Sequence, residues 1–141
     1  MSKVAVIYWT GTGNTEQMAE AIAAAAKNHG AEVDLFNISD GEPEVDSYDV
    51  LAFGCPAMGD EVLEESEFEP FYAGLEDSLD GRKVALFGSY SWAEGKWMED
   101  WTERAKSKGA VLVCDSYPQF EAPDAEGLEK CEAFGKALAE A

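Results

Sequence analysis

The chain has 141 residues, of which 46% are hydrophobic, so it is long enough for one well-buried core and too short for two ordinary domains. Its 29 acidic and 10 basic residues give a formal net charge of -19, which argues against nucleic acids and anionic membranes as partners, because proteins bind both through lysine and arginine. No run of 18 apolar residues and no signal-peptide pattern is found, so we expect a cytoplasmic protein without a membrane span.

Short apolar runs rich in β-branched side chains predict buried parallel strands. An alternating run predicts a further strand at an edge of the sheet, and amphipathic patterns predict helices between the strands. The predicted strands cover residues 4–8, 32–38 (the edge strand), 50–54, 84–88 and 111–115, and the predicted helices run from Asn14 or Thr15 as cap to Gly30 and over 66–77, 94–108 and 124–140. This alternation predicts an α/β fold with helices on both faces of the sheet, and ligands at the carboxyl ends of the strands.

The loop after the first strand, "TGTGNT", resembles a phosphate-binding loop but fails both common patterns. Gly11 and Gly13 form G-x-G, yet Glu16 stands where dinucleotide-binding loops have a third glycine, and no lysine follows Gly13 as in nucleoside-triphosphate loops. No lysine or arginine occurs between Lys3 and Lys27. Any phosphate bound here would therefore be held without a basic side chain.

Neutral donors in this loop are suited to that task. Backbone N–H groups at a helix N-terminus bind anions, and hydroxyl and amide side chains can add further hydrogen bonds. The side chains available are those of Thr10, Thr12, Asn14 and Thr15. A strand-to-helix turn without a ligand is the alternative at this point.

Aromatic and apolar side chains in two neighbouring loops indicate a planar ligand. Tyr90 and Trp92 follow the strand at 84–88, and Met58 follows the strand at 50–54. A flat ring could stack between them. Trp97 and Trp101 are spaced four residues apart on a predicted helix, which favours packing in the core instead.

Three segments resemble the flavodoxins, in particular the short-chain clostridial type, and the resemblance extends over nearly the whole chain. They read "TGTGNT" at 10–15, "CPAMGDEVLEESEFEPF" at 55–71 and "FGSYSWAEGKWM" at 87–98. The resemblance implies one flavodoxin-like domain over 1–141, a doubly wound five-stranded parallel sheet of order 2-1-3-4-5, and a monomer. It also implies non-covalent FMN that cycles between semiquinone and hydroquinone as a low-potential one-electron carrier.

The resemblance also implies roles for individual residues. Trp92 would stack on the outer face of the flavin, Met58 would cover the inner face, and Glu61 would accept the N3 proton. Gly59 would act as a redox-linked backbone switch whose carbonyl accepts the N5–H, although an ordinary glycine turn is the alternative. The implied cofactor-binding set is Thr10, Gly11, Thr12, Gly13, Asn14, Thr15, Pro56, Ala57, Met58, Gly59, Asp60, Glu61, Ser89, Tyr90, Ser91 and Trp92.

Some positions depart from the family pattern. Pro56 replaces a small hydroxyl residue, and Ser91 replaces a glycine. In the loop after the fifth predicted strand, Gln119 and Phe120 stand near a position that is polar in relatives, so contacts from this loop are in doubt, although Phe120 could screen the dimethylbenzene edge of the flavin. The three cysteines, Cys55, Cys114 and Cys131, fit no metal-ligand spacing and are expected to be reduced thiols.

The acidic segment 60–69 is expected to lower the flavin potential through unpaired carboxylates and to steer basic redox partners. By resemblance, these partners would be ferredoxin-type reductases, hydrogenase or pyruvate:ferredoxin oxidoreductase. An FMN-dependent quinone or nitro reductase is the alternative function, and an acidic scaffold without a cofactor is a third. A response regulator would need acidic residues where this chain has Trp9-Thr10, and a phosphoacceptor where it has Cys55-Pro56.

Overall fold

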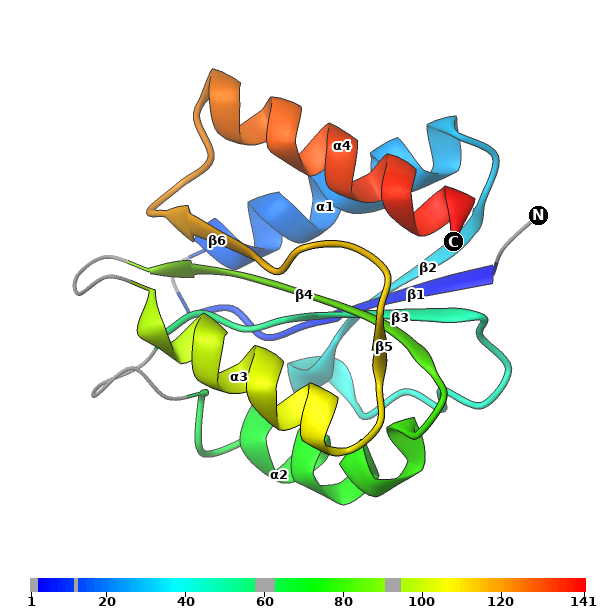
Figure 1. The fold of residues 1–141 in the computed structure, drawn as a ribbon. Helices are drawn as coiled ribbons and strands as arrows, with labels where there is room; N and C mark the ends of the chain where they lie inside the picture. The colour runs from blue at the N-terminus through cyan, green and yellow to red at the C-terminus, as the bar shows by residue number, and fades with distance from the viewer. Residues whose placement is uncertain (1–2, 12, 58–62, 91–94) are drawn as a thin grey trace.

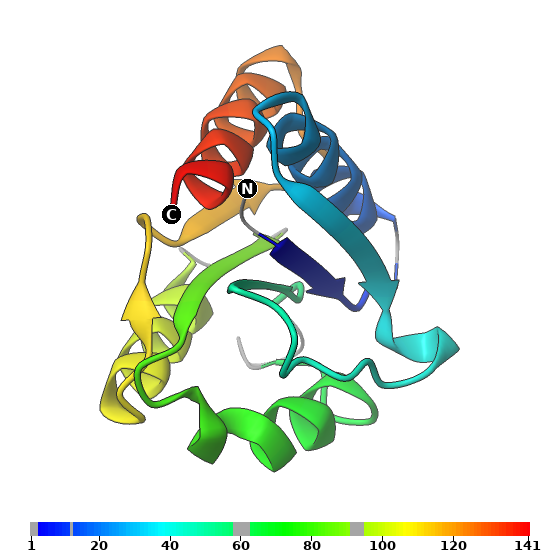
Figure 2. The same cartoon turned by 90° about the vertical axis from the view of Figure 1, so that its right-hand side faces the viewer.

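The computed structural model describes residues 3–11, 13–57, 63–90 and 95–141. A parallel sheet lies between two helical layers, with α1 and α4 on one face and α2 and α3 on the other (Figures 1 and 2). The strands are β1 (Lys3–Tyr8), β2 (Glu32–Asn37), β3 (Val50–Gly54), β4 (Lys83–Tyr90), β5 (Val111–Leu112) and β6 (Tyr117–Phe120). The α-helices are α1 (Asn14–Asn28), α2 (Phe68–Leu75), α3 (Lys96–Ser107) and α4 (Ala125–Glu140), and the short 3-10 helices are η1 (Ile38–Asp40) and η2 (Glu76–Leu79).

The strand order is β2-β1-β3-β4-β5, and every pairing is parallel. This confirms the predicted doubly wound α/β sheet and the edge position of β2. In such a sheet the loops that follow β1, β3 and β4 meet at one edge, where the strand order reverses between β1 and β3.

The last predicted strand, 111–115, is wrong in its extent. β5 ends at Leu112, and β6 pairs with β4 after the register has shifted by two residues, from Val84 opposite Leu112 to Phe87 opposite Tyr117. The extra residues interrupt the ladder as in a β-bulge. Pro118 fits β6 because the edge of a sheet tolerates a residue without an N–H.

The two faces of the sheet form two apolar clusters. On β1, Val4, Val6 and Tyr8 point to α1 and α4, whereas Ala5 and Ile7 point to the α2 and α3 side. This alternation is the period-2 pattern of a strand that is covered on both faces. All five side chains are buried, so the sheet positions the loops at its carboxyl edge rigidly.

Other predicted packing residues also lie in the core. Trp97 and Trp101 are buried on the α2 and α3 side, which confirms that they pack. Gly88 lies so close to the residue after β3 that an added Cβ would collide with the carbonyl oxygen of Cys55. The three cysteines are free thiols, as expected.

The helix ends differ slightly from the prediction. α1 ends at Asn28, and Gly30 follows at φ 96°, which confirms it as the terminator. α2 is shorter than 66–77 and continues as the 3-10 helix η2. Within the described ranges, no helix combines the length and apolar character needed to cross a membrane.

Candidate functional site

Helix α1 begins without a side-chain cap, so the expectation that Asn14 or Thr15 caps it is wrong. Its N-cap residue is Gly13, at φ 95°, which has no side chain to accept a first-turn N–H. Thr10 Oγ1 instead accepts the N–H of Gly13 itself at 3.0 Å. The unoccupied donors of a helix N-terminus attract anions. By contrast, the carboxylate of Asp124 caps α4.

Two buried hydroxyls connect the start of α1 to the end of β4. Thr15 Oγ1 and Ser89 Oγ lie 2.9 Å apart, and the two residues are only 1% and 4% exposed. The Ser89 N–H also donates to Thr15 Oγ1 at 3.4 Å. Because one hydroxyl proton satisfies the bond between them, the second remains able to donate to a ligand. This pair therefore fits a phosphate at the α1 N-terminus.

The beginning of the β3–α2 loop is attached to β4. The Cys55 N–H donates to the Phe87 carbonyl at 3.2 Å, and the Ala57 N–H donates to the Ser89 carbonyl at 2.9 Å. Pro56 and Ala57 are half-buried. Three predicted site residues, Pro56, Ala57 and Ser89, are thereby brought to the same edge of the sheet.

Glu64 anchors the other end of this loop, a role that its sequence pattern did not predict. The residue is 6% exposed, and its carboxylate accepts the N–H groups of Ser66, Glu67 and Phe68 at 2.7, 2.8 and 2.9 Å. Burial alone would raise the pKa of Glu64, but these N–H groups outweigh burial and lower it. The Glu64 N–H donates to Cys55 Sγ at 3.3 Å, so the two ends of the loop are joined at its base.

Aromatic rings gather where β4 and β6 end. The Tyr90 ring lies 5.6 Å from the Trp97 ring and 5.6 Å from the Phe120 ring, measured between centroids. Phe120 is 53% exposed, so it forms the outer member of this row. Tyr90 therefore lies at the carboxyl edge of the sheet, where the ligand was predicted to bind. The break between β5 and β6 brings Phe120 beside it.

Not every acid of the segment 60–69 is unpaired, contrary to expectation. Both carboxylate oxygens of Glu69 accept hydrogen bonds from Arg104, at 2.6 and 2.7 Å. Arg104 also donates to Glu76 at 2.6 Å, so α3 and α2 are bridged. These carboxylates raise the pKa of the Arg104 guanidinium, which stays charged and is shared between Glu69 and Glu76.

Seven of the predicted site residues lie outside the described part of the chain. They are Thr12, Met58, Gly59, Asp60, Glu61, Ser91 and Trp92.

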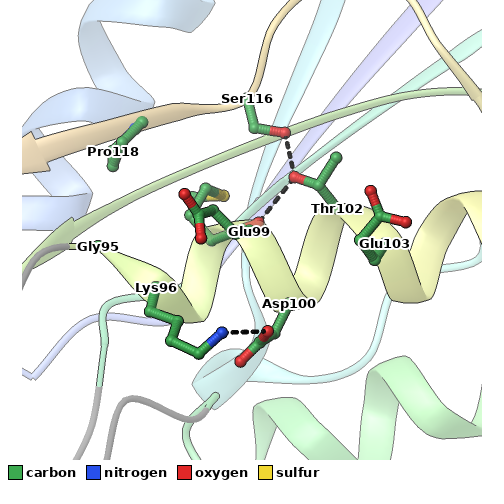
Figure 3. Close-up of a pocket in the computed structure, with 9 residues that line it drawn as sticks. Gly95, Lys96, Glu99, Asp100, Thr102, Glu103, Ser116 and Pro118 are labelled. Carbon is green, nitrogen blue, oxygen red and sulfur yellow. Dashed lines mark hydrogen bonds and ion pairs between the residues drawn. The ribbon is translucent and has the colours of Figure 1, made fainter.

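A cavity lies beside this edge of the sheet. It has a volume of about 560 Å³ and lies between α3 and the residues around β6 (Figure 3). Glu99, Asp100 and Glu103 give it an acidic lining. On its wall, Thr102 Oγ1 and Ser116 Oγ are 2.6 Å apart (Figure 3). An acidic cavity does not suit a phosphate, whereas the N-terminus of α1 does.

The described site residues can bind an anion at α1 and position a flat ring near Tyr90. Thr15, Glu64 and Ser89 are the buried polar residues in the described ranges, and all three lie at this edge of the sheet. Within the part of the chain that the structure describes, no group of histidine, cysteine and carboxylate side chains could hold a metal ion.

Comparisons with known proteins agree on one family. The flavodoxin family model matches residues 6–135. A flavodoxin from Clostridium beijerinckii is 49% identical over 135 residues, which cover 95% of this chain and 97% of that protein. A flavodoxin from Megasphaera elsdenii is 45% identical over 139 residues, covering 98% and 99%. The solution structure of two-electron reduced Megasphaera elsdenii flavodoxin superimposes with a TM-score of 0.85 at 44% identity, covering 98% of this chain and 99% of that one.

Proposed function

The chain belongs to the flavodoxin family and is an FMN-binding electron carrier, and we propose that it holds the FMN phosphate at the N-terminus of α1. The phosphate loop, residues 10–15, would surround the phosphate with backbone N–H groups and hydroxyls, and Ser89 would add a further hydroxyl. The observation that carries this proposal is the uncapped start of α1 beside the buried Thr15 and Ser89 pair. These donors fit a dianion that has no basic side chain near it.

We propose that the flavin ring lies between the loops that follow β3 and β4. The bonds that attach Cys55 and Ala57 to β4 support this position, because they hold the start of one loop beside the other. Tyr90 supplies an aromatic ring at the same edge. The remaining members of the proposed ring site are Pro56, Met58, Gly59, Asp60, Glu61, Ser91 and Trp92.

FMN, when bound, supplies a ring that accepts and releases electrons singly, and the chain's own residues would bind and orient it. Thr15 and Ser89 would hold the phosphate, and Pro56 and Ala57 would limit the access of water to the ring. We propose that Gly59 is the backbone switch at which a carbonyl oxygen accepts a flavin proton. The family comparisons favour this carrier over a quinone or nitro reductase, and we propose that it has no substrate turnover of its own.

Its partners are redox proteins, and we propose that they present basic surfaces. The net charge of -19 supports this proposal, because complementary charge accelerates encounter. We further propose that residues 1–141 form one domain and a cytoplasmic monomer. The single sheet to which all strands belong supports one domain. The three free thiols support a reducing compartment such as the cytoplasm. Ferredoxin-type reductases, hydrogenase and pyruvate:ferredoxin oxidoreductase are the proposed partner types.

The phosphate site is tested by removing the buried hydroxyls. Thr15→Val combined with Ser89→Ala should weaken FMN binding about tenfold or more, because two donors to a charged group are lost. Thr102→Val combined with Ser116→Ala is the matched control, since it removes both hydroxyls of a similar pair that joins α3 to the segment before β6, beside the acidic cavity. Equilibrium dialysis gives the dissociation constants. Equal FMN affinity in both variants would contradict the proposed site.

A further inference from the structure

We infer that Glu67 is a positioning residue for the phosphate loop and acts on it through the indole of Trp9. The inference rests on the proposed function, because it assumes that the loop at residues 10–15 binds the FMN phosphate. Glu67 itself lies just before α2, outside that loop.

A single carboxylate oxygen connects three loops that are distant in sequence. Glu67 Oε1 accepts the indole N–H of Trp9 at 3.0 Å and the hydroxyl of Ser39 at 3.0 Å. Trp9 follows β1, Ser39 lies in η1 after β2, and Glu67 ends the loop after β3. The side chain of Glu67 thus joins the connections that leave three adjacent strands.

The Trp9 indole lies directly against the phosphate loop. A Cβ added at Gly11 would be 3.0 Å from Trp9 Cη2 and 3.3 Å from Cζ3, so the six-membered ring packs on the Gly11 backbone. The backbone of Trp9 is fixed by its N–H bond to the Gly54 carbonyl at 3.0 Å. The hydrogen bond to Glu67 fixes the rotation of the indole ring, because the indole N–H is the polar end of the Trp9 side chain. An indole that turned would no longer support Gly11.

The negative charge of Glu67 by itself should weaken FMN binding, whereas its hydrogen bonds should strengthen FMN binding. A carboxylate near a dianion is unfavourable, so the loss of its charge alone should strengthen FMN binding. Glu65 provides the matched control, since it lies in the same turn, is exposed, and makes no hydrogen bond to any residue that the structure describes. Variants at both positions change the charge equally, but those at Glu67 also affect the bonds to Trp9 and Ser39.

The test compares four variants of the full chain by equilibrium dialysis against FMN. Glu67→Ala should bind FMN about fivefold more weakly than Glu65→Ala, which corresponds to the loss of one or two modest hydrogen bonds. Glu67→Gln should bind FMN as well as Glu65→Gln does, because the amide oxygen can still accept both bonds. Equal affinities of Glu67→Ala and Glu65→Ala would overturn the inference.

Trp9→Phe provides a second test that leaves Glu67 in place. It removes the N–H and also the outer part of the indole that contacts Gly11, so it should weaken FMN binding at least as much as Glu67→Ala does. The double variant should be no weaker than Trp9→Phe alone, because the bond that Glu67→Ala removes is already absent there. If Glu67→Ala fails to fold, the Trp9→Phe result decides: unchanged affinity would overturn the inference.

The ³¹P resonance of bound FMN separates this inference from the proposed function. Relative to Glu65→Ala, Glu67→Ala should move the phosphate resonance and leave the visible flavin spectrum unchanged. A changed visible spectrum with an unmoved ³¹P resonance would place the effect at the ring and overturn the inference. If the unaltered chain shows the resonance of free FMN, the proposed phosphate site itself fails. If its resonance is shifted but both variants agree with each other, only the inference fails.

Discussion

Replacing Glu64 should destabilise the fold more than replacing any exposed acid. In Glu64→Ala the N–H groups of Ser66, Glu67 and Phe68 lose their acceptor. Loss of a helix cap costs about 0.5 to 2 kcal/mol, and Phe68 is fully buried, so its N–H adds an unsatisfied-donor cost of about 1 kcal/mol or more. We expect a loss of about 3 kcal/mol in the free energy of unfolding. Glu64→Gln retains one oxygen and should lose about half of that.

Urea denaturation of the FMN-free chain at pH 7 measures this loss without a contribution from cofactor binding. Glu65→Ala removes the same charge from an exposed position in the same turn and should leave the free energy of unfolding unchanged within error. A Glu64→Ala variant as stable as Glu65→Ala would refute the reasoning from these hydrogen bonds.

The same residue predicts a pH dependence. The folded state lowers the pKa of Glu64 below the ordinary value of 4.5, so the folded state favours the carboxylate. Its stabilising contribution is therefore fully present above pH 4.5 and is lost as the pH falls through the lower folded pKa. The difference in stability between the unaltered chain and Glu64→Ala should be constant near neutral pH and should narrow below pH 4.5. A difference that grows in acid would contradict this sign.

Two further predictions concern packing and ion pairs, and urea denaturation measures both. Arg104→Leu should lower the free energy of unfolding by about 2 kcal/mol, because two carboxylates next to α3 lose their shared partner. Lys108→Leu, at an exposed ion pair, should leave the free energy of unfolding unchanged within error. Similar losses in the two variants would contradict the proposed importance of the bridge. Gly88→Ala should cost about 3 kcal/mol, because its Cβ would collide with the carbonyl of Cys55, directly after β3. Gly74→Ala, with open space around it on α2, should instead gain about 0.5 to 1 kcal/mol. A well-tolerated Gly88→Ala would show that β3 and β4 can separate.

The features that follow from local patterns could be predicted from the sequence. The run at 4–8 became a strand buried on both faces, and the helix from Asn14 ended before Gly30, because strand and helix periodicity and a glycine terminator are encoded in neighbouring residues. The meeting of the loops after β1, β3 and β4 followed from the alternation of strands and helices, since parallel strands end at one edge of the sheet.

Contacts across the sheet could not be predicted in this way. Thr15 is of a residue type that commonly caps helices, yet its hydroxyl forms a hydrogen bond with Ser89, which is 74 residues away in sequence. Glu64 and Glu67 were counted only as charges, although one caps α2 and the other holds Trp9. Their roles depend on which loops become neighbours, and charge patterns along one chain do not contain that information.

The interrupted outer strand also affects how the protein behaves at high concentration. An uninterrupted edge strand offers a row of unpaired backbone groups to which a second chain can add its own strand, the first step towards aggregation. Here one edge consists of β5, which has two residues, and of β6, where Pro118 lacks an N–H. The opposite edge, β2, carries the charged side chains of Glu32 and Asp34. Neither edge offers a long, flat, uncharged template, so this fold is well protected against strand-by-strand growth into fibrils.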